Sequence, residues 1–141
     1  MHIDFLRERF AAAAGQDALI WRDQAYTYGW LLEELDRLTT SLDELDVPRG
    51  AAVSVEADFS PRAVALLLAL IERNAILVPL TSSVEEKKPE FREIGEVEAV
   101  VEIRADDTLH ARSTGHTATH ELITELKRYM EIGRASCRER V

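Results

Sequence analysis

Two acidic residues, Glu56 and Asp58, are the side chains in this sequence whose position is most typical of a binding site. They follow a short apolar stretch that is predicted as a strand, and open α/β sheets bind ligands at the carboxyl ends of their strands. A carboxylate pair at such a place could hold a metal ion. The alternative is a solvated loop, which we favour because the chain has 26 acidic residues.

Three histidines and a short hydroxyl-rich run are the other candidates. His110, His116 and His120 form an H-x5-H-x3-H series, and imidazole is a frequent zinc ligand. Zinc sites prefer tighter pairings with cysteine or carboxylate, so we favour surface histidines. Residues 113–115 (Ser-Thr-Gly) have no lysine nearby, and a phosphate-binding loop is therefore not supported. No Ser/His/Asp or Cys/His arrangement is detectable.

The elements that would position these residues centre on the stretch from Ala51 to Leu80. Ala51–Val55 is apolar and β-branched, which predicts a strand. Ser60 and the proline after it form a helix start, and the apolar run 63–71 predicts a helix packed on a sheet. Asn74 can end that helix in the left-handed conformation, and Ile76–Val78 is a second strand. A strand, a helix and a strand make a right-handed βαβ unit, so the sequence predicts an α/β fold with a parallel sheet.

Further elements flank this unit on its amino-terminal side. The sequence predicts a helix over Ile3–Ala14 and a hairpin of the strands Ala18–Trp21 and Ala25–Thr27. Thr27 is placed to cap a helix running from Tyr28 to about Leu45, whose leucines form one stripe. Three aromatic residues at this junction are assigned to the core: Tyr26, Tyr28 and Trp30.

The carboxyl-terminal side carries shorter elements. Residues 81–93 are predicted as a loop and a short helix, and Val97–Ile103 as a third strand parallel to the first two. Leu109–Arg112 is a candidate fourth strand. Thr119 is expected to cap a last helix that reaches Met130.

Composition excludes several classes of protein. The net charge of −9 argues against binding to nucleic acid, which needs a basic surface. The longest uncharged apolar run, residues 63–71, is too short to span a bilayer, and the amino terminus lacks a signal-peptide core. The single cysteine, Cys137, excludes an internal disulfide framework and fits a reducing cytoplasm. We therefore expect a cytoplasmic protein.

The last ten residues, 132–141, suit neither the acidic chain before them nor a core pattern. The DNA string ATCGGAAGAGCGTCGTGTAGGGAAAGAGTG encodes them, and this string resembles a common short-read sequencing adapter. We expect residues 132–141 to be an artefactual, disordered tail, and residues 1–131 to be one truncated domain. Leaving this tail out removes three arginines and one glutamate, which gives residues 1–131 a net charge of −11.

Two stretches carry a resemblance to a known family. Tyr26–Leu31 (YTYGWL) resembles the L-T-Y-x-E-L motif of the AMP-forming acyl ligases, the ANL superfamily. Leu70–Leu80 (LIERNAILVPL) resembles their L-x-A-G-A-x-x-V-P-L motif, and the turn at Asp46–Gly50 also looks like that family. The resemblance covers roughly residues 13–131. Trp30 stands where the family has an acid, and an asparagine replaces its helix-ending glycine.

The resemblance implies a fold and an activity for a longer parent protein. The chain would be the amino-terminal part of the large domain of an adenylate-forming enzyme. The parent would use ATP and Mg²⁺ to convert a carboxylic acid to an acyl-adenylate, and would then transfer the acyl group to a thiol. That thiol is usually coenzyme A, as in the acyl-CoA synthetases; a carrier-protein thiol is the alternative. The acyl substrate and the oligomeric state are left open.

The resemblance assigns no catalytic, cofactor-binding or metal-binding residue to this chain. The serine/threonine/glycine-rich phosphate loop of the family, closed by lysine, normally follows the helix that here is residues 119–130. We therefore expect the chain to be inactive by itself. The alternative is a small receiver-like signalling domain built on Glu56 and Asp58. Such a domain should have a further aspartate, for which Asp106 or Asp107 is a weak match, and a later lysine, for which there is no candidate.

Overall fold

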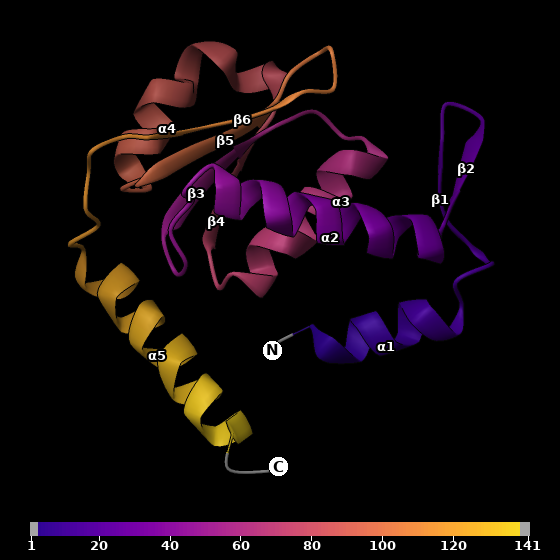
Figure 1. Cartoon of the computed structure of the whole chain (residues 1–141). Coiled ribbons are helices and arrows are strands. Elements are labelled where there is room, and N and C mark those ends of the chain that lie inside the picture. The colour runs from indigo at the N-terminus through magenta and orange to yellow at the C-terminus, as the bar shows by residue number, and fades with distance from the viewer. Residues whose placement is uncertain (1–2, 139–141) are drawn as a thin grey trace.

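A four-stranded sheet forms the centre of the protein (Figure 1). The computed structural model describes the backbone of residues 3–138 and the side chains as far as residue 131. The strand order is β4-β3-β5-β6. Strand β3 (Ala52–Glu56) pairs in parallel with β4 (Ile76–Leu80) on one side and with β5 (Ala99–Ile103) on the other. Strand β6 (Leu109–Ser113) is antiparallel to β5. The predicted α/β fold with a parallel core is confirmed.

Helix α3 (Pro61–Glu72) is the crossover of the βαβ unit. Its first turn is capped as predicted, because the Ala63 amide donates to the Ser60 hydroxyl at 3.1 Å and the proline occupies the first helical position. Asn74 has a φ of +57°, which confirms that asparagine ends this segment in the left-handed region. The chain can then turn directly into β4.

The amino-terminal elements are also those that the sequence predicts. Strands β1 (Asp17–Trp21) and β2 (Gln24–Thr27) form an antiparallel hairpin. Helix α2 (Tyr28–Glu44) follows directly, and the Trp30 amide donates to the Thr27 hydroxyl at 3.1 Å, so the predicted cap is confirmed. Helix α1 (Asp4–Ala12) packs beside α2.

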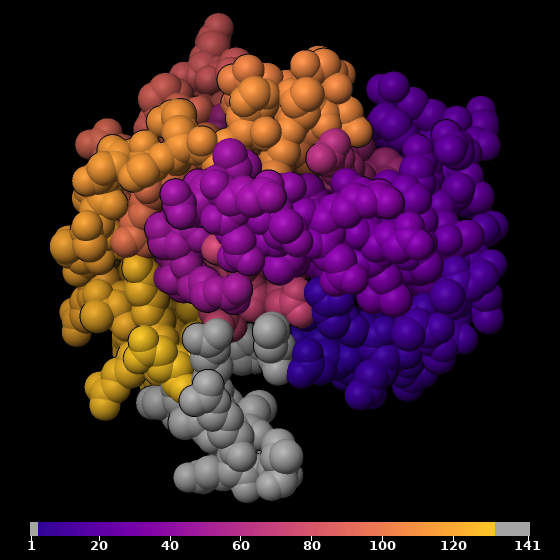
Figure 2. All heavy atoms as spheres, viewed as in Figure 1, coloured from indigo at the N-terminus to yellow at the C-terminus, as the bar shows by residue number. Residues whose placement is uncertain are grey.

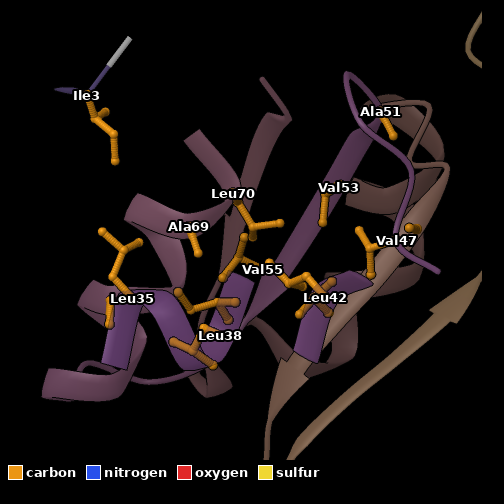
Figure 3. Packing of buried hydrophobic residues seen from close by; sticks show 14 of the residues in the cluster. Ile3, Leu35, Leu38, Leu42, Val47, Ala51, Val53, Val55, Ala69 and Leu70 are labelled. Atoms are coloured by element: carbon orange, nitrogen blue, oxygen red, sulfur yellow. The ribbon is translucent and has the colours of Figure 1, made fainter. Parts of the chain in front are cut away.

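The main core lies between helices α2 and α3 and one face of the sheet (Figure 3). Helix α2 contributes a leucine stripe and α3 contributes Leu66 and Leu70, all fully buried. Val53 and Val55 of β3 point into the same cluster. The fully buried members of the stripe on α2 are Leu35, Leu38 and Leu42. On α3, by contrast, Leu67 lies near the middle of the predicted apolar helix but is only half-buried.

The opposite face of the sheet is mixed, because Ala52, Leu80 and Val100 are buried there beside polar side chains of β3. Successive side chains of a strand point to opposite faces, so Ser54 and Glu56 face away from the main core. A 3-10 turn, η1 (Ser82–Lys87), and helix α4 (Lys88–Ile94) correspond to the predicted loop and short helix. Arg92 of α4 pairs with Glu56, which places α4 over this face.

Helix α5 runs from Glu121 to Arg138, and its start differs from the prediction. The Thr119 hydroxyl donates to a Glu96 carboxylate oxygen at 3.4 Å, and the ring of His120 accepts the Leu122 amide at 3.2 Å. The imidazole therefore takes the capping role expected of the threonine, because the helix begins later. None of the helices in the described part of the chain has the length and apolar character of a membrane-spanning segment.

The backbone of residues 132–138 continues α5, where the sequence predicts a disordered tail. Side chains of residues 132–141, and the whole of residues 139–141, lie outside the described part of the chain. That the tail makes no core contacts therefore stays a prediction.

Replacing Leu66 by alanine tests the core. This side chain is fully buried, so Leu66→Ala should lower the free energy of unfolding by about 2–5 kcal/mol, from lost burial and the cavity left behind. Urea unfolding followed by circular dichroism measures the loss. The control is Ile71→Ala on the same helix, where the side chain is 38% exposed and the cost should be about 1 kcal/mol or less. Equal losses in both variants would contradict the assigned packing.

Deleting residues 132–141 tests the tail. If these residues are artefactual, the shortened chain should melt within about 1 °C of the full chain, because no stabilising contact is lost. Thermal unfolding of both proteins under one set of conditions measures the difference. A clear loss of stability on deletion would show that the tail packs on the domain.

Candidate functional site

A hollow of about 760 Å³ lies at the carboxyl ends of the parallel strands. Glu56 ends β3, Ile103 ends β5, and Ser82 follows β4; all three line the hollow. The remaining wall comes from the hairpin β1–β2, the first turns of α2 and α3, the segment η1–α4 and the turn between β5 and β6. Ligands of open α/β sheets bind at this edge, so the hollow is the candidate site that the fold supplies.

Glu56 is the most buried acid at the edge of the hollow, with 5% of its surface exposed. Arg92 donates to it twice, from Nε at 2.6 Å and from Nη2 at 2.7 Å. The Lys88 ammonium lies 3.6 Å from it, and the Ser54 hydroxyl donates at 3.2 Å. Burial raises the pKa of Glu56, but the hydrogen bonds and positive charge of Arg92 and Lys88 outweigh burial and hold the pKa below its usual value.

Asp58, the second predicted acid, has different partners. The Ser82 amide and hydroxyl donate to its two oxygens, each at 2.8 Å. These hydrogen bonds from Ser82 lower the pKa of Asp58. Glu56 and Asp58 line the same hollow, but each carboxylate already serves protein donors. Across the described residues no group of three or more His, Cys, Asp or Glu side chains is arranged to hold a metal ion.

Aromatic side chains form one wall of the hollow. Tyr26 and Trp30 pack edge to face with their ring centroids 4.7 Å apart, and the Arg22 guanidinium lies 4.1 Å from the centre of the Trp21 ring. All four residues line the hollow. Trp30 also packs against the main core, as the sequence assignment expected, but that assignment misses the place of Tyr26 and Trp30 beside the hollow. Tyr28 instead packs against Phe10 with centroids 5.1 Å apart.

Three of the four cationic side chains that line the hollow are engaged in ion pairs, and the fourth is Arg22, over the Trp21 ring. Arg62 lies 3.2 Å from Glu34 and also contacts Asp107. Arg104 pairs with Glu102 at 2.6 Å. Lys88, already beside Glu56, also pairs with Glu85. A polyanionic ligand in this hollow would have to displace acids from these cations, and each displacement costs free energy.

The three histidines do not converge in the described structure. His110 exchanges a hydrogen bond with the Thr108 hydroxyl, and His116 lies 3.6 Å from Glu96. His120 caps α5. The three rings thus make different contacts, although the His120 amide also donates to Glu96, and the preference for surface histidines over a zinc site stays a prediction.

The hydroxyl-rich run at residues 113–115 stabilises a turn. The Thr114 hydroxyl donates to the Val97 carbonyl at 2.7 Å, and the Gly115 amide donates to the Ser113 hydroxyl at 3.1 Å. Gly115 has a φ of +73°, a conformation that glycine adopts without strain. These groups are used within the chain.

The family model described as AMP-binding enzyme matches residues 6–131. The chain belongs to this family. The match spans the hairpin, the βαβ unit and the described side chains of α5, so the resemblance inferred from residues 26–31 and 70–80 is confirmed.

Relatives and solved structures agree with this assignment. Pyochelin synthetase PchE of Pseudomonas aeruginosa is 39% identical over 80 residues, which are 57% of this chain and 6% of that protein. The uncharacterized acyl–CoA ligase YtcI of Bacillus subtilis is 27% identical over 90 residues, 60% of this chain and 17% of that one. A fused adenylation–PCP di-domain containing NpsA of Klebsiella oxytoca shares the fold with a TM-score of 0.67 and 23% identity, over 74% of this chain and 20% of that chain.

The chain thus spans only a small part of the proteins that it resembles. The isolated amino-terminal subdomain of NpsA, solved with 3-hydroxybenzoyl-AMSN, has a TM-score of 0.66 at 23% identity, and this chain covers 27% of it. At this identity the likeness shows the fold alone. The fold is that of the amino-terminal subdomain of adenylation domains.

Replacing Glu56 by glutamine tests the buried ion pair. Glu56→Gln should lower the free energy of unfolding at pH 7 by about 1.5–3 kcal/mol, because the bonds from Arg92 lose their charged acceptor. A carboxylate with a folded-state pKa below its ordinary value of 4.5 contributes stability above that pH, and this contribution is lost as the pH falls below it. The difference between variant and parent should therefore shrink in acid. Denaturant unfolding at several pH values measures it.

The control for this experiment is Glu86→Gln, at an exposed position of η1. It removes the same charge, and its stability should follow the parent at every pH. A deficit in Glu56→Gln that stays constant down to low pH would mean that the carboxylate charge does not stabilise the fold.

Proposed function

We propose that this chain is an amino-terminal piece of an ATP-dependent ligase that activates carboxylic acids as acyl-adenylates. The observation that carries the proposal is the family match over residues 6–131. It is supported by NpsA, whose solved complexes contain anthranilyl and hydroxybenzoyl groups joined to AMSN. A cytoplasmic location fits the sequence.

The parent reaction has two steps in this proposal. A carboxylate oxygen attacks the α-phosphorus of Mg²⁺-bound ATP, the bond to the β-phosphate oxygen breaks, and pyrophosphate leaves. A thiol, of coenzyme A or of a carrier protein, then attacks the acyl carbon and releases AMP. The first step requires positive charge and N–H groups placed around the phosphates. Coenzyme A is favoured by the likeness to YtcI, which is described as an acyl–CoA ligase, and the thiol of a carrier protein is the alternative.

This piece supplies the scaffold of that enzyme and not its phosphate site. Arg62, Lys88, Arg92 and Arg104 are each paired with acids of the chain itself. Residues 1–131 have no glycine-rich loop closed by lysine, and their net charge is strongly negative. The two family motifs act locally: Thr27 caps α2, and Asn74 ends the crossover segment.

Titration with Mg-ATP tests the proposal directly. Isothermal titration of residues 1–131 should give no heat beyond dilution at about 1 mM nucleotide, because the chain offers no free cradle for a triphosphate. A pyrophosphate-release assay with mixed carboxylic acids should stay at background.

The product of the uninterrupted gene serves as the positive control. It should bind Mg-ATP and release pyrophosphate if it carries the missing phosphate loop. Micromolar binding or any turnover by residues 1–131 alone would place an active site within this chain and overturn the proposal.

A further inference from the structure

Helix α5 carries an apolar stripe that faces solvent. Leu122, Leu126 and Tyr129 follow one another at intervals of four and three residues, which places them on one side of a helix. Their exposed fractions are 69%, 45% and 64%. Large apolar side chains scattered singly on a surface are ordinary, but three in a row on one helix face indicate a contact surface.

Polar groups attach α5 to the rest of the domain. The Lys127 ammonium donates to Glu98 at 2.8 Å, and the His120 amide donates to Glu96 at 2.7 Å. Among the described side chains, none of α5 belongs to the main hydrophobic cluster. In the views of Figures 1 and 2 the helix lies at the margin of the body. Among the described side chains of α5, Ile123 and Met130 are half-buried, so the exposed stripe is a second apolar face that the described residues leave uncovered.

We propose that the stripe of Leu122, Leu126 and Tyr129 is the surface on which the following part of the adenylate-forming domain packs. This inference rests on the proposed function. We choose the rest of the same domain as the partner that covers the stripe, because this protein spans only 20–27% of the NpsA chains that it matches. The matching partner surface is apolar and belongs to the same polypeptide.

A second copy of this chain fits the stripe less well. Two molecules that each carry a net charge of −9 repel one another. A stable interface between separate proteins also buries about 800 Å² on each partner, far more than three side chains provide. A contact within one polypeptide avoids the entropic cost of association, so a small apolar stripe suffices there.

The test compares one variant in two proteins. Leu122→Glu combined with Leu126→Glu should leave residues 1–131 melting within about 1 °C of the parent, because both side chains are exposed there. In the product of the uninterrupted gene the same pair should lower the melting temperature by about 5 °C or more, because two charges would be buried. The matched control, Arg128→Glu, adds the same negative charge at an exposed position of α5 and should be neutral in both proteins.

A labelling experiment covers the case in which the doubly charged variant fails to fold in the long protein. In Leu126→Cys, maleimide labelling at this cysteine, located by mass spectrometry, should be at least about tenfold slower in the long protein than in residues 1–131, because burial restricts access to the thiol.

Three outcomes would overturn the inference. Equal labelling rates, or equal shifts of melting temperature in the two proteins, would show that nothing covers the stripe, while the proposed function could still stand. Dimers of residues 1–131 in analytical ultracentrifugation that dissociate on Leu126→Glu would make a second copy the occupant. A gene product that ends near residue 131 would remove this inference and the proposed function together.

Discussion

The burial of strand β3 on both faces is the constraint on which the rest of the structure depends. All five of its residues are buried, so each face of the sheet has to be covered at this strand. Val53 and Val55 require an apolar cover, which α2 and α3 provide. Glu56 on the other face requires a cation, because an unpaired buried carboxylate is costly. Helix α4, which covers this face, supplies it through Arg92.

Carboxylates connect segments throughout this acidic protein. Glu98 accepts from the Ala52 amide, the Ala118 amide and Lys127, and so joins the start of β3, the loop before α5, and α5 itself. Burial raises the pKa of Glu98, but the hydrogen bonds from Lys127 and the two amides lower it further than burial raises it. Glu72 accepts two hydrogen bonds from Arg7, which ties α1 to α3. These carboxylates act as hydrogen-bond acceptors that hold segments together. The large number of acidic residues in the chain is therefore no indication of a metal site.

Local signals made most of the fold predictable from the sequence. Capping by Ser60 and Thr27 and the left-handed Asn74 are decided within a few residues, so the sequence alone locates them. Contacts between distant segments were not predictable in this way. The wall that Tyr26 and Trp30 form beside the hollow depends on how the hairpin lies against the sheet. Likewise the hydrogen bond from the His120 amide to Glu96, across 24 residues, ties the start of α5 to the body of the domain, and no pattern within α5 predicts it.

Family membership and the absence of assigned catalytic groups are compatible for a physical reason. The motif at residues 26–31 contains a strand end, a helix cap and the first turn of α2, and that at residues 70–80 contains a helix end and β4. Both fix directions of the backbone, which every member of a fold needs whatever its substrate. Groups that stabilise a transferring phosphoryl centre must instead be cationic and free to meet the ligand. Three of the cations that line the hollow, Arg62, Lys88 and Arg104, are already engaged by acids of this chain, and the fourth, Arg22, lies over the Trp21 ring.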